Sequence, residues 1–293
     1  MDTRHFIGTL IFLLLSHTAH ADLPLSIEDL LTDKGKLKLE LSLAYGNHDR
    51  QGLAVGEPLL LQTGPTSFIS LPTRIGETKT NSDALVATAG LRYGLMARTE
   101  IFTRASALYR HTRSSSALSE PSPQKESRFA DAWLGINHQF KKDDATPAVL
   151  GFVELALREK HQNSSSSFKS FLLGLSAYKA IDPVVFSLTA ATRLNQSRKD
   201  GNSSYKPGNL LLLNPSIAFA VNDQVTFTGG VQWTAQQADR QDGQAQGFRR
   251  TSTSLLLGVG YGISKDSTIN LSFKANASGS GGADLRLSWL HTL

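Results

Sequence analysis

Residues 36–45 read KLKLELSLAY, in which every second side chain is apolar and those between are charged, hydroxylated or small. Successive side chains of a β-strand point to opposite faces, so this stretch predicts a strand with one apolar and one polar face. Comparable runs recur about twelve times along the chain. Such recurrence is typical of transmembrane β-barrels. The sequence therefore predicts an all-β fold, a transmembrane antiparallel β-barrel of about twelve strands.

The N-terminus has the pattern of a cleavable signal peptide, with Arg4 before the apolar run 6–15 and a small-residue site at 19–21. That run is shorter than the ~20 residues of a spanning helix, and no later stretch reaches this length. Only a closed barrel can then cross a bilayer. We therefore expect a signal peptide at 1–21, a periplasmic segment at 22–34 and a barrel at 35–293, in the bacterial outer membrane.

Composition excludes several kinds of site. The chain has no cysteine, which rules out disulfides, thiolate metal sites and a lipid-modified cysteine. Its formal net charge is +5, but nucleic acid is not an expected partner of an exported chain. Hydrophobic residues make up 40% of the sequence, which suits a barrel because half of each strand faces water.

Candidate strands are the period-2 runs bounded by Gly, Asn, Asp, Ser and Pro. They fall at 35–46, 83–94, 99–111, 129–140, 148–159, 167–178, 183–195, 208–221, 224–236, 250–262, 268–276 and 283–292. Short links alternate with long polar segments at 47–82, 112–128, 160–166, 196–206 and 237–249. Outer-membrane barrels have short periplasmic turns and longer external loops, so both termini should be periplasmic.

Alternation also predicts which side chains meet lipid. The clearest lipid-facing sets are Leu37, Leu39, Leu41 and Leu43; Val225, Phe227, Val231 and Trp233; Leu255, Leu257, Val259 and Tyr261; Leu285, Leu287 and Trp289. In the sixth strand, Lys169, Phe171, Leu173 and Leu175 compete with Phe168, Leu172 and Tyr178, so its facing stays open. Pro215 cannot donate to a ladder, so we expect a bulge or a local break there.

Aromatic residues collect near the predicted strand ends, as expected of girdles at two membrane interfaces. The outer set is Tyr45, Tyr109, Phe168 and Trp233, and the inner set is Tyr93, Phe140, Tyr178, Tyr261 and Trp289. Aromatics also close strands in other β proteins, which is the alternative interpretation.

Charged residues on the polar faces should line the lumen, because Arg or Lys on the lipid face costs ~2 to 4 kcal/mol near the bilayer middle. They are Lys38, Glu40, Arg92, Arg104, Asp131, Glu154, Arg158, Arg193, Lys274 and Arg286. Basic groups outnumber acidic ones, which favours anions in a pore. The alternative is that these groups pair across strands and only hold the barrel closed.

Two segments outside the strands are unusual. Residues 23–35 suit a short helix capped by Ser26 and ended by Gly35, which is either a lumen plug or a frayed periplasmic lead. The first long loop contains the apolar stretches 59–61 and 68–71 between prolines. We expect it to fold over or into the mouth and meet an apolar ligand, or to form a small hairpin above the membrane.

Residues 25–47 (LSIEDLLTDKGKLKLELSLAYGN) and 91–109 (LRYGLMARTEIFTRASALY) resemble outer-membrane transporters of the phenol-degradation meta-pathway family. This family includes the channel that secretes functional amyloid subunits in pseudomonads. The resemblance implies a twelve-stranded barrel whose lumen is plugged by an N-terminal helix. The matching plug residues here are Ile27, Leu30, Leu31 and Asp33.

The amyloid secretion channel also carries a long N-terminal coiled-coil region, whereas this chain has only a few residues between Asp22 and the plug-like segment. The resemblance therefore favours passage of small molecules, aromatic or apolar in character. Expected partners are outer-membrane lipid, the transported small molecule or a secreted polypeptide, and the barrel-assembly machinery.

No enzymatic motif appears, so we expect no catalysis, no metal and no cofactor. The histidines at 48, 111, 138, 161 and 291 have no serine or carboxylate at a spacing that predicts a triad. Triad members are brought together in space, however, so a barrel enzyme stays an alternative. A polypeptide secretion pore and a loop-displaying adhesin are the others.

Overall fold

The computed structural model describes residues 31–50, 53–54, 59–71, 76–77, 79–116, 119–161, 164–200, 203–278 and 282–293. The expected signal peptide, and Ile27 and Leu30 of the expected plug, lie outside these residues. All regular elements in the described ranges are β-strands. Within the same ranges, no helix has the length and apolar character needed to cross a membrane.

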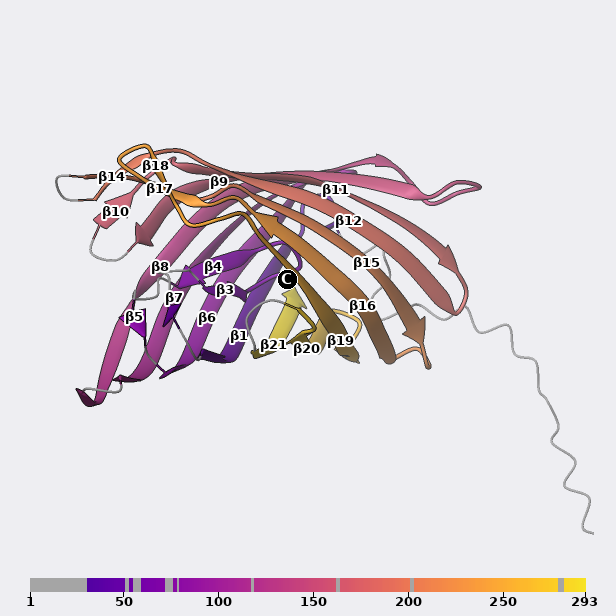
Figure 1. The fold of residues 1–293 in the computed structure, drawn as a ribbon. Coiled ribbons are helices and arrows are strands. Elements are labelled where there is room, and N and C mark those ends of the chain that lie inside the picture. The colour runs from indigo at the N-terminus through magenta and orange to yellow at the C-terminus, as the bar shows by residue number, and fades with distance from the viewer. Residues whose placement is uncertain are drawn as a thin grey trace, which may run out of the picture.

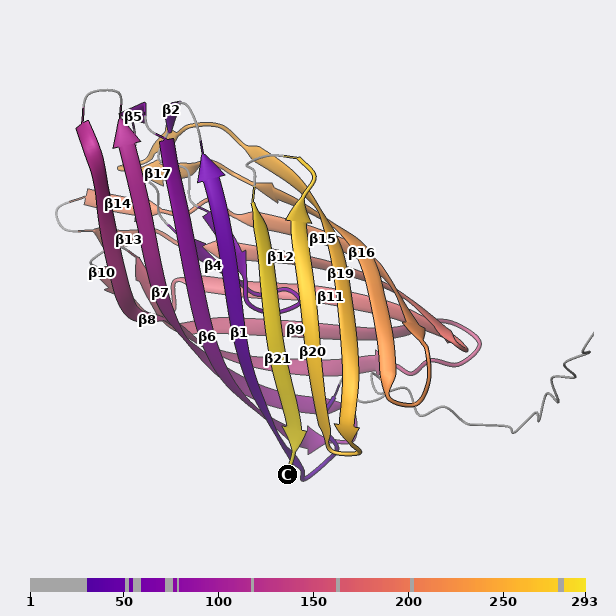
Figure 2. The ribbon, with the colours of Figure 1, turned by 90° about the horizontal axis from the view of Figure 1, so that it is seen from below.

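A closed antiparallel barrel forms the body of the molecule (Figure 1). Its twelve strands in order are β1 (Leu37–Arg50), β6 (Lys79–Met96), β7 (Thr99–Ser116), β8 (Ser119–Lys141), β9 (Ala148–His161), β11 (Ser170–Ile181), β12 (Val184–Asn195), β15 (Leu210–Ala220), β16 (Val225–Gln236), β19 (Arg250–Ser264), β20 (Ser267–Asn276) and β21 (Ala283–Thr292). β1 pairs with both β6 and β21, which closes the wall without a free edge (Figure 2). The predicted barrel and its strand number are confirmed.

The outward face of the wall is apolar. In β1, Leu41 and Leu43 are exposed while Ser42 and Ala44 between them are buried. Leu255 and Leu257 of β19 and Leu285 and Leu287 of β21 are exposed in the same way. A closed wall satisfies its backbone hydrogen bonds internally, so an apolar outer face places it in lipid.

The structure defines the facing of β11 and the backbone pairing at Pro215, which the sequence pattern left open. In β11, Leu173 and Leu175 are exposed whereas Leu172 and Tyr178 are buried, so the odd-numbered residues face lipid. Pro215 of β15 pairs with Leu188 of β12, but residues 214 and 215 form no pair with β16, and the register is unchanged on either side. The break expected at Pro215 is therefore local, with no bulge.

The connections alternate as predicted, with tight turns at the end where β1 begins and longer segments at the other, outer end. The expected loop at 112–128 is wrong, however, because β7 and β8 continue as a paired hairpin up to Ser116 and Ser119. The residues of this segment are polar on both faces, so they show no apolar–polar alternation that would predict a strand. Backbone pairing nevertheless continues beyond the apolar belt. Segments 196–206 and 237–249 likewise build a four-stranded sheet from β13 (Arg198–Asp200), β14 (Ser203–Lys206), β17 (Asp239–Gln241) and β18 (Gln244–Gln246).

Candidate functional site

An apolar hairpin from the first outer connection lies inside the barrel. It consists of β3 (Leu59–Gln62) and β4 (Phe68–Leu71), visible within the curved wall in Figure 1. Leu61 and Leu71 are fully buried, and with Ile69 they pack against the lumen faces of β1, β6, β7 and β8. The wall residues of this cluster are Ala44, Ala84, Val86, Leu108 and Ala130. The loop therefore forms the expected hairpin, but the hairpin lies inside the barrel and not above the membrane. Its contact with an apolar ligand stays a prediction.

A second apolar cluster surrounds Trp133, which points into the lumen from β8 and is 1% exposed. Phe68 of the hairpin packs in this cluster, together with Leu150, Phe152, Ala156, Leu172, Ala191, Leu210 and Leu212 of the wall. Leu60 of the hairpin and Leu31 of the N-terminal segment pack against it as well. Segments from the two ends of the barrel thus meet one apolar centre.

Polar contacts hold the hairpin at its turn. The Thr63 amide donates to the Ser67 carbonyl oxygen at 2.9 Å, which closes the turn. Arg193 Nη1 of β12 donates to the Phe68 carbonyl oxygen at 3.1 Å, and Lys274 Nζ of β20 lies 5.9 Å from the Phe68 ring centroid. A cation at this distance attracts the ring face.

At the inner end, the charged side chains form a connected network. Arg92 Nη2 donates to Glu40 at 2.8 Å, and Arg92 Nη1 donates to Glu100 at 3.2 Å. Asn137 Nδ2 also donates to Glu100, at 2.6 Å. Glu100 is 0% exposed, so these donors take the place of the water that would otherwise hydrate its carboxylate. Removing one partner from such a buried network costs more than the loss of a surface pair.

The N-terminal segment is tied to this network. The Thr32 amide donates to Glu100 Oε2 at 2.7 Å, and the Gly35 amide donates to the Gly94 carbonyl oxygen at 2.8 Å. A Cβ atom on Gly94 would lie 1.9 Å from the Asp33 carbonyl oxygen, so this close approach requires glycine. Of the expected plug residues, Leu31 faces the lumen cluster, while the exposed Asp33 side chain pairs with Lys36 at 3.2 Å.

Two guanidinium groups lie over the Trp133 ring. Arg104 and Arg193 lie 5.1 Å and 5.0 Å from its ring centroid. Arg104 Nη2 donates to Glu154 at 2.8 Å, and Arg193 pairs with Glu159. The Trp133 indole N–H donates to Asp131 at 2.9 Å. The wall therefore carries fixed charge pairs beside apolar side chains.

The structure places nine of the ten predicted lumen residues on the inner face. The prediction is wrong for the tenth, Arg158, which lies on the outward face. The pairing of β8 with β9 shifts register between Ala132 and Trp133. Arg158 lies opposite Ala132 and Ala156 lies opposite Trp133, so the residue between them, Leu157, is the extra residue of a bulge in β9. This bulge reverses the alternation, which exposes Arg158 and turns the 6%-exposed Glu159 inward. The nine on the inner face are Lys38, Glu40, Arg92, Arg104, Asp131, Glu154, Arg193, Lys274 and Arg286.

Several lumen acids lie outside the set predicted from the sequence. Glu100 shares its face with Arg104, and Asp284 shares its face with Arg286, so alternation contains the signal for both. Asp284 pairs with Lys274 at 2.7 Å and lies 3.5 Å from His48 Nε2. Glu159 has no such signal because the bulge arises from pairing between strands. Arg286 makes no hydrogen bond or ion pair with a described residue, and its Nη1 lies near the hairpin turn at Gly64.

The predicted girdle residues lie on the outward face. Tyr45, Tyr93, Tyr109 and Tyr261 are exposed there, whereas Trp233 and Trp289 are half-buried against neighbouring side chains. The Tyr45 hydroxyl donates to Asp83 at 2.7 Å. Tyr178 is the exception, because it is buried in the lumen and its hydroxyl accepts a hydrogen bond from Gln139. Their role at membrane interfaces stays a prediction.

Among the described residues, no cluster of three or more His, Cys, Asp or Glu side chains has the arrangement of a metal site. Outside the membrane, the clearest electrostatic effect lies in the β8–β9 turn. The Thr146 amide donates to the Asp144 carboxylate at 2.9 Å, and Lys141 pairs with it at 3.0 Å. These contacts lower the pKa of Asp144 to about 2.

Comparison with solved structures agrees with this fold. An outer membrane channel from Pseudomonas putida F1 superposes with a TM-score of 0.65 at 12% identity, covering 90% of this chain and 98% of that one. The translocator domain of the autotransporter NalP from Neisseria meningitidis gives 0.55 at 10% identity, covering 90% and 91%. The NanC porin gives 0.51 at 10% identity, covering 87% and 100%. At these identities the likeness concerns the fold.

No curated protein matches the sequence at a significant level. The family model described as "Putative MetA-pathway of phenol degradation" matches residues 27–284. This match takes in β1 to β20 and the first two of the ten residues of β21. The chain therefore belongs to this phenol-degradation MetA-pathway family, with the fold of an outer-membrane β-barrel.

Proposed function

We propose that this chain is a passive outer-membrane channel for small molecules with an aromatic or apolar body. In this proposal the β3–β4 hairpin closes the lumen at its outer end, and the N-terminal segment closes it at the inner end. The observation that carries the proposal is the burial of an apolar hairpin inside a complete barrel.

The hairpin is separable from the wall. In the described part of the chain, β3 and β4 form a two-stranded sheet of their own and share no ladder with the barrel strands. They are held by apolar packing and by the Arg193 hydrogen bond to Phe68. Withdrawal of the hairpin therefore breaks no backbone pairing of the wall, so the barrel stays closed while the lumen opens.

The solute class follows from what the hairpin covers. Phe68 and Leu60 lie against Trp133, Leu210 and Leu212, which form an apolar surface inside the barrel. Arg104 and Arg193 lie beside the same tryptophan. A solute that replaces the hairpin meets apolar and cationic groups together, which suits a small molecule with an apolar body and a polar or anionic end.

The N-terminal plug is tested by deleting residues 22–34 while keeping the signal peptide. The expected result is faster flux of a small aromatic solute into liposomes, because the contacts of Leu31 and Thr32 with the lumen are lost. Heat-modifiable gel mobility serves as the folding control. Unaltered flux in a folded variant would mean that this segment does not gate the lumen.

The same liposomes separate the alternatives. A secretion pore would release a polypeptide but discriminate little among small solutes, an adhesin would show no flux in either variant, and a barrel enzyme would hydrolyse lipid or peptide substrates. The channel proposal predicts solute flux without such hydrolysis.

A further inference from the structure

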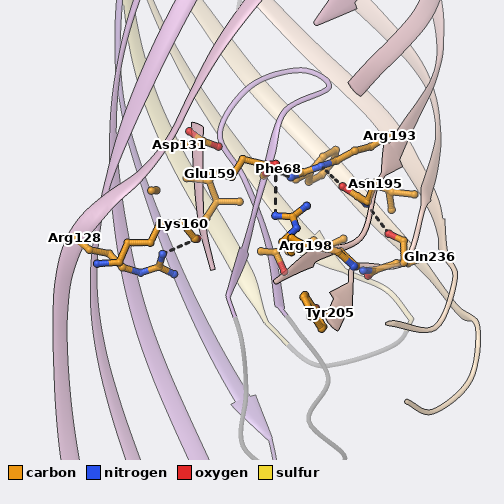
Figure 3. A pocket seen from close by; sticks show the side chains of 17 residues that line it. Phe68, Arg128, Asp131, Glu159, Lys160, Arg193, Asn195, Arg198, Tyr205 and Gln236 are labelled. Atoms are coloured by element: carbon orange, nitrogen blue, oxygen red, sulfur yellow. Dashed lines mark hydrogen bonds and ion pairs between the residues drawn. The ribbon is translucent and has the colours of Figure 1, made fainter. Parts of the chain in front are cut away.

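A pocket opens between the hairpin and the wall at the outer end of the barrel (Figure 3). The hairpin contributes Leu60, Phe68 and Ile69 to its lining. The wall and the segment after β12 contribute the cations Arg128, Lys160, Arg193 and Arg198. One side of the pocket is therefore apolar and the other is basic.

The charges that line the pocket do not balance. Its lining includes only two carboxylates, Asp131 and Glu159, against four cations. Arg193 and Arg198 share Glu159, with Arg198 Nη1 at 3.5 Å from Oε2. Asp131 accepts the Trp133 indole N–H instead of pairing with one of the cations. Arg128 pairs with Glu126, which lies outside the lining, at 2.6 Å, so the remaining surplus comes from Lys160, Arg193 and Arg198 against Glu159 and Asp131. A positive surplus in a partly dehydrated place favours an anion.

Arg198 is the best-placed group to receive an anion. Its side chain is 5% exposed, and its Nε–H makes no hydrogen bond to a described residue. Its Nη2 donates to Ser170 Oγ at 3.1 Å. Burial lowers the pKa of Arg198, and Glu159 opposes this effect, but a guanidinium stays protonated in proteins. A buried cation with an unused donor gains a charge-assisted hydrogen bond from an added carboxylate.

We propose that this pocket binds a small organic anion, with its carboxylate against Arg198 and its apolar body against Phe68 and Leu60. The pocket adjoins the hairpin, so it is the place where a solute from outside would be captured before passage. This inference rests on the proposed channel function for its biological role, but binding itself requires no flux.

The test is a calorimetric titration of the purified full-length barrel with benzoate. Benzyl alcohol serves as the neutral ligand of similar body. Arg198→Gln should weaken benzoate binding by roughly tenfold or more, because a hydrogen bond to a charged group is lost. Lys160→Gln should weaken it as well, to a smaller extent. The matched control is Arg158→Gln, which removes the same charge from the outward face next to the pocket.

Several results would overturn the inference. The first is that benzoate does not bind to the wild-type barrel. The second is that Arg158→Gln and Arg198→Gln lose benzoate affinity equally. The third is that benzyl alcohol binds as tightly as benzoate and that its affinity falls as much in Arg198→Gln. If Arg198→Gln fails to fold by gel mobility, Lys160→Gln alone decides, and unchanged affinity there contradicts the proposal. A barrel that conducts without binding benzoate refutes only this inference, whereas one that binds without conducting refutes only the channel.

Discussion

Replacing Phe68 by alanine should open the lumen without unfolding the barrel. The ring is 4% exposed and packs in the cluster around Trp133. A buried phenylalanine removes about 200 Å² from water. Its truncation in a packed core costs about 3 to 5 kcal/mol. Because the hairpin shares no ladder with the wall, most of this loss weakens docking of the hairpin, and about 3 kcal/mol raises the ratio of undocked to docked hairpin by more than about 100-fold.

The assay is single-channel recording in planar bilayers. Phe68→Ala should show a much larger open fraction than the wild type at every voltage. Phe248→Ala is the matched control, because Phe248 is 89% exposed in an outer connection. A wild-type open fraction in folded Phe68→Ala, or an equal rise of the open fraction in Phe248→Ala, would show that packing of Phe68 does not hold the hairpin in the lumen.

Three further outcomes are expected. Glu100→Ala removes the buried acceptor of the Thr32 amide and of Asn137, while Arg92 keeps Glu40, and should lower stability to guanidinium by about 1 to 3 kcal/mol. Leu257→Arg, on the outward face of β19, should cost about 2 to 4 kcal/mol in lipid bilayers, whereas Leu257→Phe should be nearly neutral. Asp144 has a lowered pKa of about 2, so its contribution to the turn is present above its unfolded value of about 4 and is lost as pH falls toward 2. Its carboxyl chemical shift should titrate near pH 2, and a midpoint near 4 would contradict the turn contacts.

The wall of the barrel could be predicted from the sequence because its cause is local. A strand with lipid on one side and side chains on the other must alternate, so Leu41 and Leu43 face outward while Glu40 and Ser42 face inward. The same alternation predicts most of the charged lumen. It fails at Arg158, since a bulge depends on how β9 pairs with β8 and leaves no mark in either strand alone.

The contents of the lumen were harder to predict. The apolar stretches at 59–61 and 68–71 indicated that this loop avoids water, but only the structure shows that Leu61 and Leu71 reach the inner wall. Their partners come from strands far apart in sequence, such as Val86 and Leu108. The ladder beyond the membrane at 112–128 was also missed, because its polar residues carry no alternation although its backbone pairs.

The most direct test of lumen closure by the hairpin is the steady conductance of the full-length barrel in planar bilayers against a variant whose residues 59–71 are replaced by a Gly-Ser segment of equal length. The variant should show a large and lasting increase in conductance, with unchanged heat-modifiable mobility. Equal conductance of the two folded barrels would contradict the claim that this hairpin closes the lumen.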